Sequence, residues 1–237
     1  MSESVFHFRQ FTVQQDKCAM KVGTDAVLLG SWVKTNQSRY ILDIGTGTGL
    51  IALMLAQKSA AYIDAVDIDE TAVEQARMNF SASPWNDRLT VTHMSFQSFS
   101  ESTTKKYDLV VTNPPYFHHA SKPAEEARLN ARHDVQLSFE ALICGVKKVL
   151  SDDGRLCIIL PFKEALEFMD MAQSKGLFCH EMMRVRTKAD KTEKRMMMEF
   201  STQFGLLNES EMVIQDDCNS YTEEYIEMTK DFFPGLK

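Results

Sequence analysis

Three glycines and two aspartates have the types and spacing needed to hold a nucleotide-like ligand. Single threonines separate Gly45, Gly47 and Gly49, Asp43 lies two positions before them, and Asp67 follows at the end of the next apolar run. Glycine permits the positive φ angles of a tight turn, and a helix that starts after such a turn presents free N–H groups and the positive end of its dipole. The pattern predicts a binding crevice in which Asp67 accepts hydrogen bonds from ribose hydroxyls. The alternative interpretation is an ordinary turn with surface acids.

The spacing of the glycines favours a cationic ligand over a dinucleotide. A dinucleotide fingerprint reads G-x-G-x-x-G, whereas this segment reads D-x-G-x-G-x-G. Asp43 would repel a pyrophosphate but could hold an amine. S-adenosylmethionine (AdoMet) joins an adenosine to a positively charged amino acid, so we predict AdoMet as the cofactor. The residues predicted to bind it from this region are Asp43, Gly45, Thr46, Gly47, Gly49, Asp67 and Ile68.

A second polar segment could orient an amino group for methyl transfer. The residues Asn113-Pro114-Pro115-Tyr116 follow the apolar run of residues 107–111. The prolines fix φ and supply no N–H, so the loop is stiff. The Asn113 amide, which also borders the cofactor, and the Pro114 carbonyl could accept the hydrogens of an exocyclic amine, while Tyr116 stacks on a flipped base. We predict Asn113, Pro114 and Tyr116 as catalytic residues. The alternative is a strand end that the prolines merely stiffen.

Residues 43–49, Asp67 and residues 113–116 together resemble the motifs of class I AdoMet-dependent amino-methyltransferases. The Asn-Pro-Pro-Tyr motif occurs in DNA adenine, rRNA guanine-N2 and protein glutamine methyltransferases, so it indicates the chemistry more than the substrate. The segment Met20-Lys-Val-Gly-Thr-Asp-Ala-Val-Leu-Leu-Gly-Ser-Trp32 is more specific. It is similar to the bacterial tRNA1(Val) adenine-N6-methyltransferase family, and this resemblance covers nearly the whole chain.

The family resemblance implies a substrate and two further cofactor contacts. It implies methylation of N6 of adenosine 37, on the 3′ side of the anticodon in tRNA1(Val). It also implies that the segment before the glycine loop closes over the methionine end of AdoMet, with Lys21 and Thr24 as candidate contacts.

Three other functions remain as alternatives. An AdoMet sensor would bind without catalysis, but it would have no use for a stiff Asn-Pro-Pro-Tyr loop. A glutamine methyltransferase acting on a release factor is expected to carry a sizeable N-terminal module, whereas the glycine loop here begins at residue 45. An rRNA guanine methyltransferase often carries a duplicated domain, which the sequence does not show.

The hydrophobic pattern predicts a doubly wound, Rossmann-like α/β fold. Apolar strand-like runs alternate with helical segments as far as residue 175, and residues 178–186 and 195–204 form a predicted hairpin. The family resemblance implies seven strands with the last one antiparallel. We expect Phe96, after the third strand, to pack near the adenine. The chain is predicted to divide into a hairpin and helix covering the cofactor (residues 1–39), the methyltransferase core (40–205) and an acidic C-terminal extension with a helix (206–237).

The charge distribution leaves room for an RNA partner although the net charge is −7. Residues 206–237 carry eight acids against two lysines, so the rest of the chain is close to neutral. Residues 184–195 carry six basic residues and two acids, and a local basic stripe can bind phosphates. A solvated hairpin loop is the alternative. The residues predicted to contact RNA are Lys122, Arg128, Arg132, His133, Arg184, Arg186, Lys188 and Lys191.

Composition favours a cytoplasmic protein without a metal or a membrane partner. The chain has 237 residues, a length that suits one domain with short additions. Its five cysteines are scattered and lack Cys-x-x-Cys spacing, which is typical of thiols in a reducing compartment. No apolar run approaches the roughly twenty residues of a membrane span, and the N-terminus does not resemble a secretion signal.

Overall fold

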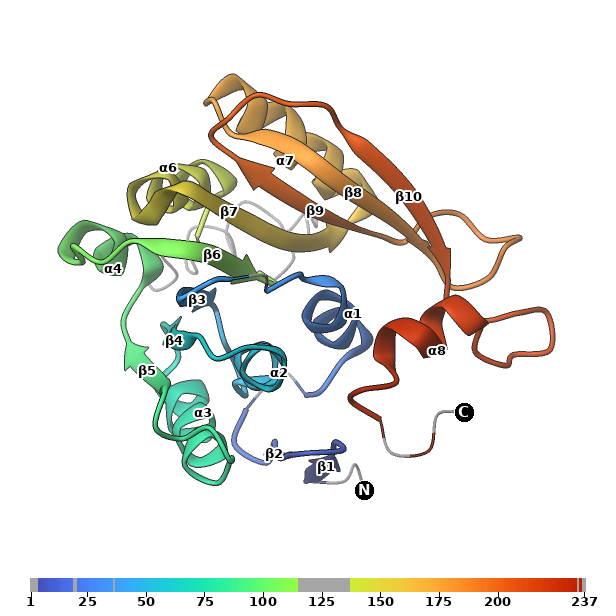
Figure 1. Ribbon diagram of the computed structural model, residues 1–237, viewed down its shortest axis with the longest axis horizontal. Helices are drawn as coiled ribbons and strands as arrows, with labels where there is room; N and C mark the ends of the chain where they lie inside the picture. Colours follow the sequence, from blue (N-terminus) through green and yellow to red (C-terminus); the bar gives the residue numbers. More distant parts are fainter. Residues whose placement is uncertain (1–3, 19–20, 36, 115–136, 234, 236–237) are drawn as a thin grey trace, which may run out of the picture.

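A mixed eight-stranded sheet lies at the centre of the molecule (Figure 1). The computed structural model describes residues 4–18, 21–35, 37–114, 137–233 and 235. The strand order is β10-β8-β9-β7-β6-β3-β4-β5, and β9 runs antiparallel to both of its neighbours while all other pairs are parallel. The strands are β3 (Tyr40–Ile44), β4 (Tyr62–Asp67), β5 (Leu89–His93), β6 (Tyr107–Thr112), β7 (Leu150–Pro161), β8 (Phe178–Arg186), β9 (Arg195–Ser201) and β10 (Asn208–Val213).

Helices cover both faces of the sheet, so each face has its own apolar core (Figure 1). Side chains alternate between the faces of a strand; Ile41 of β3 accordingly joins one core and Leu42 the other. The first core receives α1 (Thr24–Trp32), α2 (Leu50–Lys58), α3 (Glu70–Ser81) and α8 (Glu223–Thr229). The second receives α4 (Phe96–Ser102), α6 (Phe139–Val149) and α7 (Phe162–Ser174). The doubly wound α/β prediction is confirmed.

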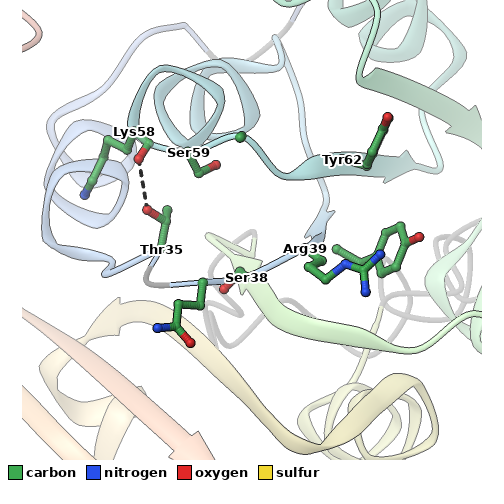
Figure 2. Close-up of a pocket in the computed structure, with 9 residues that line it drawn as sticks. Thr35, Ser38, Arg39, Lys58, Ser59 and Tyr62 are labelled. Carbon is green, nitrogen blue, oxygen red and sulfur yellow. Dashed lines mark hydrogen bonds between the residues drawn. The ribbon is translucent and has the colours of Figure 1, made fainter.

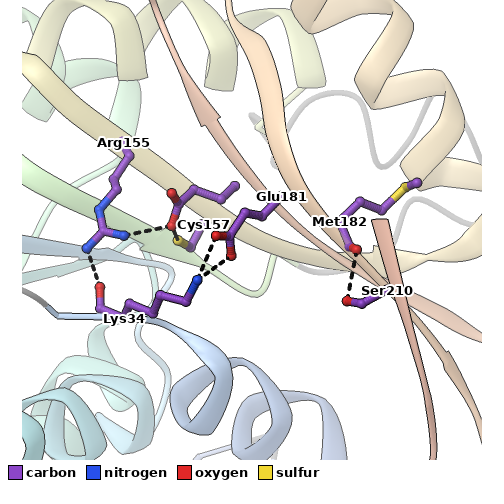
Figure 3. Close-up of polar contacts among 7 residues, drawn as sticks. Lys34, Arg155, Cys157, Glu181, Met182 and Ser210 are labelled. Carbon is purple, nitrogen blue, oxygen red and sulfur yellow. Dashed lines mark hydrogen bonds and ion pairs between the residues drawn. The ribbon is translucent and has the colours of Figure 1, made fainter. Parts of the chain in front are cut away.

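The sheet has one strand more than predicted, because the acidic extension contributes β10. This strand pairs in parallel with β8 at the sheet edge, and the Ser210 hydroxyl donates to the Met182 carbonyl at 3.2 Å (Figure 3). The sequence of β10 is Asn-Glu-Ser-Glu-Met-Val, of which Met212 alone is buried. Such a polar edge strand shows no apolar alternation from which it could be predicted. The predicted hairpin is confirmed as the antiparallel pair β8 and β9.

A charged network joins the chain after α1 to the far half of the sheet (Figure 3). Lys34 binds both carboxylate oxygens of Glu181 on β8, at 2.6 and 2.8 Å. Arg155 on β7 pairs with Glu199 on β9 at 2.8 Å and also donates to the Lys34 carbonyl. The Cys157 thiol donates to the same Glu199 carboxylate at 3.5 Å, and burial raises the pKa of this thiol. These contacts hold α1 against strands far from it in the sequence.

The two ends of the described chain pack on the first core. The N-terminal hairpin of β1 (Val5–His7) and β2 (Thr12–Gln14) buries Phe8 and Phe11 in that core, together with Phe232. The Arg9 amide donates to the Phe232 carbonyl at 2.7 Å, so the hairpin is tied directly to the chain after α8. Across the described ranges, none of the helices combines the length and apolar character that crossing a membrane requires.

Candidate active site

The carboxyl ends of β3, β4 and β6 bring the predicted motifs to one edge of the sheet. Ile44 of β3 lies opposite Val66 of β4 on one side and Thr112 of β6 on the other. Adjacent strands lie about 4.8 Å apart, so the glycine loop leaves the sheet between Asp67 and Asn113. The Thr112 hydroxyl, fully buried, donates to the Ile44 carbonyl at 2.9 Å and joins the two strands at this level. This edge is where ligands bind in open α/β sheets.

The glycine loop requires glycine for two different reasons. Gly45, Gly47 and Gly49 have φ angles of 69°, 56° and 83°, a region that side chains disfavour. A Cβ on Gly49 would lie 2.5 Å from the ring of Phe80, whereas a Cβ on Gly45 would meet no atom within 4 Å. The close approach of Gly49 to Phe80 sets the packing of the loop on α3. The absence of any atom near the Cβ position of Gly45 shows open space above the loop.

Asp67 is held in place by the loop that it faces. One carboxylate oxygen accepts the Gly47 amide at 2.8 Å and the other accepts the Asp69 amide at 3.0 Å. Each oxygen keeps acceptor capacity for a further donor, which suits the predicted contact with two ribose hydroxyls. Asp69 has a different role, because its side chain accepts the amides of Thr71 and Ala72 and so caps α3.

Asp43 is a buried carboxylate that forms no ion pair with the residues that the structure describes. Its side chain is fully buried, and one oxygen accepts the Thr46 hydroxyl at 2.6 Å. The other oxygen, Oδ1, accepts no hydrogen bond from the described part of the chain. Burial raises the pKa of Asp43 from its ordinary value of 3.8 to about 7. A cationic amine nearby would satisfy this carboxylate, which fits the predicted role of Asp43.

Ile68 exposes an apolar side chain directly after Asp67, whereas Phe96 lies in the core. The side chain of Ile68 is 59% exposed directly after Asp67, and that of Phe96 is 4% exposed. The Phe96 ring packs so closely on α6 that a Cβ on Gly145 would lie 2.6 Å from it. The geometry therefore favours Ile68 for contact with an adenine ring and leaves Phe96 a packing role.

The segment predicted to be catalytic begins where β6 ends. Asn113 is half-buried and Pro114 is buried at the carboxyl edge of the sheet. Other predicted site residues lie outside the described residues: Tyr116, Lys122, Arg128, Arg132 and His133.

Residues 21–23 lead directly into α1. Lys21 and Thr24 are exposed, and Thr24 is the first residue of α1. Gly23 occupies the N-cap position and no side chain caps the helix. Asp25 pairs with Arg195 at the start of β9, at 2.8 Å, which ties this segment to the sheet.

Several cations of the predicted basic stripe pair with acids, some from β10 and some within the stripe itself. Arg184 pairs with Glu209 and Glu211 of β10. Arg186 pairs with Glu193 at 2.5 Å. Lys191 binds Asp190 at 2.9 Å, and Lys188 lies 3.5 Å from the Asp217 carbonyl. Arg184, Arg186 and Lys191 of the stripe are therefore paired with carboxylates in this structure.

Two buried amides that the sequence analysis did not single out contact the site from α3. Asn79 donates to the Thr48 carbonyl in the glycine loop at 2.8 Å. Gln75 accepts the Lys17 amide at 2.9 Å. The two amides are four residues apart and therefore lie on one face of the helix, which they share with buried alanines. This spacing is the feature of the sequence that could have indicated them.

A surface cavity lies at the opposite edge of the sheet (Figure 2). It has a volume of about 420 Å³ and is lined by residues before β3, at the end of α2 and at the start of β4, among them Thr35, Arg39 and Tyr62. Lys58, which borders it, donates to three carbonyls at the end of α1. The Lys58 ammonium therefore caps α1 and is not available for a ligand in this cavity. The side chains at the carboxyl edge of the sheet have the chemistry of a binding site, so the candidate site lies there.

Comparisons with known proteins identify the family of the chain. The model of the methyltransferase small domain matches residues 18–178. Proteins named tRNA1(Val) (adenine(37)-N6)-methyltransferase are similar over nearly their full length. Those from Flavobacterium psychrophilum and Trichodesmium erythraeum are 46% and 45% identical, covering 97% and 98% of this chain and 99% of each relative. The one from Haemophilus influenzae is 40% identical, covering 97% of this chain and 98% of the relative.

Solved structures show the same fold. A predicted O-methyltransferase from Agrobacterium tumefaciens superimposes with a TM-score of 0.70 at 18% identity, covering 88% of this chain and 96% of that one. A glycopeptide N-methyltransferase complexed with S-adenosylmethionine has a TM-score of 0.56 at 12% identity, covering 77% and 95%. With the motifs at one sheet edge and the full-length relatives, the chain belongs to the tRNA1(Val) (adenine(37)-N6)-methyltransferase family.

Proposed function

We propose that the protein transfers a methyl group from AdoMet to N6 of adenosine 37, next to the anticodon of tRNA1(Val). The observation that carries the proposal is the strand register, which sets the glycine loop between Asp67 and Asn113 at one edge of the sheet. A cofactor cradle and an amine-orienting loop on adjacent strands suit direct transfer between two bound molecules. The substrate comes from the names of the relatives, which match this chain almost end to end.

The side chains at this edge fit AdoMet. Asp67 would accept the ribose hydroxyls, Ile68 would pack on the adenine, and Asp43 would face the ammonium group. The orphaned Asp43 Oδ1 and the open space above Gly45 support this fit. Lys21 and Thr24 would close the methionine end, with residues 1–39 as the cover, 40–205 as the core and 206–237 as the extension. When bound, AdoMet supplies an electrophilic methyl group.

The proposed catalytic work consists mainly of orientation. The side-chain carbonyl of Asn113 and the backbone carbonyl of Pro114 accept the two hydrogens of the adenine amine, which leaves its lone pair directed at the methyl group. Tyr116 stacks on the flipped base. The amine loses its proton during or after transfer, so the chain needs no strong base at this position.

RNA would be bound by the basic residues on both sides of the catalytic loop. Lys122, Arg128, Arg132 and His133 follow Asn113 closely in the chain. Arg184, Arg186, Lys188 and Lys191 would have to exchange their present carboxylate and carbonyl partners for phosphates. Such an exchange makes binding sensitive to salt. A tRNA substrate places the activity in the cytoplasm.

The test is methyl transfer from labelled AdoMet to three separate fractions from a strain that lacks the enzyme: total tRNA, rRNA and a release-factor-containing protein fraction. We expect label in tRNA, in N6-methyladenosine, decreasing steeply as salt is added. A transcript of tRNA1(Val) with adenosine 37 replaced by guanosine is the matched control and should stay unlabelled. Label confined to protein or to rRNA would contradict the proposal.

A further inference from the structure

Asn79 joins the N-terminal segment to the glycine loop. Its Nδ2 donates to the Thr48 carbonyl at 2.8 Å and to the Gln14 carbonyl at 2.9 Å, and its Oδ1 accepts the Gln14 amide at 2.9 Å. The side chain is 2% exposed. Three backbone groups from two separate segments therefore depend on one buried amide, and each would be costly to leave unpaired.

Two further buried amides form hydrogen bonds with the backbone of the N-terminal segment. Gln75, one turn before Asn79 on α3, accepts the Lys17 amide at 2.9 Å. Gln15 accepts the Val22 amide at 2.7 Å. Next to Lys17, the Cys18 sulfur lies 3.9 Å from the Cβ position of Gly47 in the glycine loop. Residues 14–18 are therefore held beside this loop.

We propose that Asn79 is a positioning residue for AdoMet binding. It fixes residues 14–18 against the glycine loop, and Gln15 ties Val22 to that stretch, so that Lys21 and Thr24 stand ready to close over the cofactor. The inference rests on the proposed cofactor, which Asn79 itself does not touch. With this amide in place, the covering segment is already ordered before AdoMet binds. The conformational entropy of that segment is therefore lost on folding and does not weaken the binding of AdoMet.

The alternative is that Asn79 only stabilises the fold, and a matched variant separates the two roles. Asn79→Leu keeps the approximate size of the side chain and removes its three hydrogen bonds. Tyr107→Phe removes a partly buried hydrogen bond of 2.7 Å to Asp64, at the opposite edge of the sheet. Both variants should lower the melting temperature, but only Asn79→Leu should alter the binding of AdoMet.

The experiment is calorimetric titration of each variant with AdoMet well below its melting temperature, followed by methylation of tRNA. For Asn79→Leu we expect the Kd and KM for AdoMet to rise about tenfold, the equivalent of one net hydrogen bond to the covering segment. At saturating AdoMet, kcat should stay within about threefold of the wild type, because chemistry is unchanged once the cover is closed. Trypsin should also cleave after Lys17 faster in this variant.

A Kd for Asn79→Leu within twofold of the wild type would overturn the inference, and so would an equal rise in Tyr107→Phe. If Asn79→Leu does not fold, Gln15→Met takes its place, since it releases the Val22 amide at the other end of the segment. An unchanged Kd for AdoMet in Gln15→Met would equally overturn the inference, and a raised Kd would support it. Failure of the proposed function would be visible in the wild type, as absent AdoMet binding or label outside tRNA. Failure of this inference would be visible in the variants alone.

Discussion

Replacing Asp43 by asparagine should make the ligand-free protein more stable while weakening its binding of AdoMet. The carboxyl group is fully buried, and burial raises its pKa from 3.8 to about 7. The difference between these values, about 3, corresponds to about 4 kcal/mol at 1.4 kcal/mol per pH unit. Asparagine keeps an acceptor for the Thr46 hydroxyl but carries no charge, so Asp43→Asn avoids this cost.

The effect has a definite pH dependence. A folded-state pKa above the unfolded one means that the folded protein holds its proton more tightly. The stability that the protonated carboxyl contributes is complete below pH 3.8 and is lost as the pH rises towards about 7. Across this pH range, the free energy of unfolding of the wild type should therefore fall relative to that of Asp43→Asn. At higher pH it should stay about 4 kcal/mol below that of the variant.

Urea unfolding at a series of pH values measures this difference directly, and calorimetry measures the affinity for AdoMet. In the wild type, affinity should decrease below pH 7, because the ammonium binds the ionised carboxylate, whereas the weaker binding of Asp43→Asn should not show this decrease. Asp64→Asn is the control of opposite sign. Burial raises the pKa of Asp64, but hydrogen bonds from Lys105, Tyr107 and Thr90 outweigh burial and lower it, so removing this charge should destabilise the protein at neutral pH.

Two results would refute this reasoning about Asp43. Parallel stability curves for the wild type and Asp43→Asn between pH 4.5 and 8 would show that the buried carboxylate carries no cost. Equal affinities for AdoMet at pH 8 would remove Asp43 from the ammonium site.

Other changes test the remaining parts of the site. Asn113→Ala should retain AdoMet affinity in calorimetry and lose turnover by about 10² or more; loss of both would identify a structural residue. Glu209→Gln with Glu211→Gln should release Arg184, and should tighten tRNA binding and steepen its salt dependence in filter binding; unchanged binding would exclude this arginine from the RNA surface. Gly49→Ala should cost at least about 1–2 kcal/mol in urea unfolding, from its positive φ, before the contact with the adjacent ring is added. An unaltered unfolding midpoint would contradict the loop geometry.

Several features of the fold and site were predictable because they depend on neighbours in the sequence. The run Asp-Ile-Gly-Thr-Gly-Thr-Gly predicts a tight turn, since φ preferences belong to single residues, and the three positive φ angles agree with it. Asp69 caps α3 through the amides of Thr71 and Ala72, and such a cap depends only on residues two or three apart in the sequence. Alternating strands and helices followed from apolar periodicity, and that alternation implies that the motifs meet at the carboxyl edge.

Other features arise only when distant segments meet. The arginines of β8 form a basic stripe in the sequence, yet Glu209 and Glu211 of β10 neutralise Arg184 in the structure. Phe96 and Ile68 could each have faced an adenine, and helix packing buries the first while leaving the second exposed. Asn79 is one polar residue of a helix until folding places two segments, some thirty and more than sixty residues away, against its amide. Charge pairing, burial and hydrogen bonding between such segments have no periodic signature in the chain, so only the tertiary structure decided them.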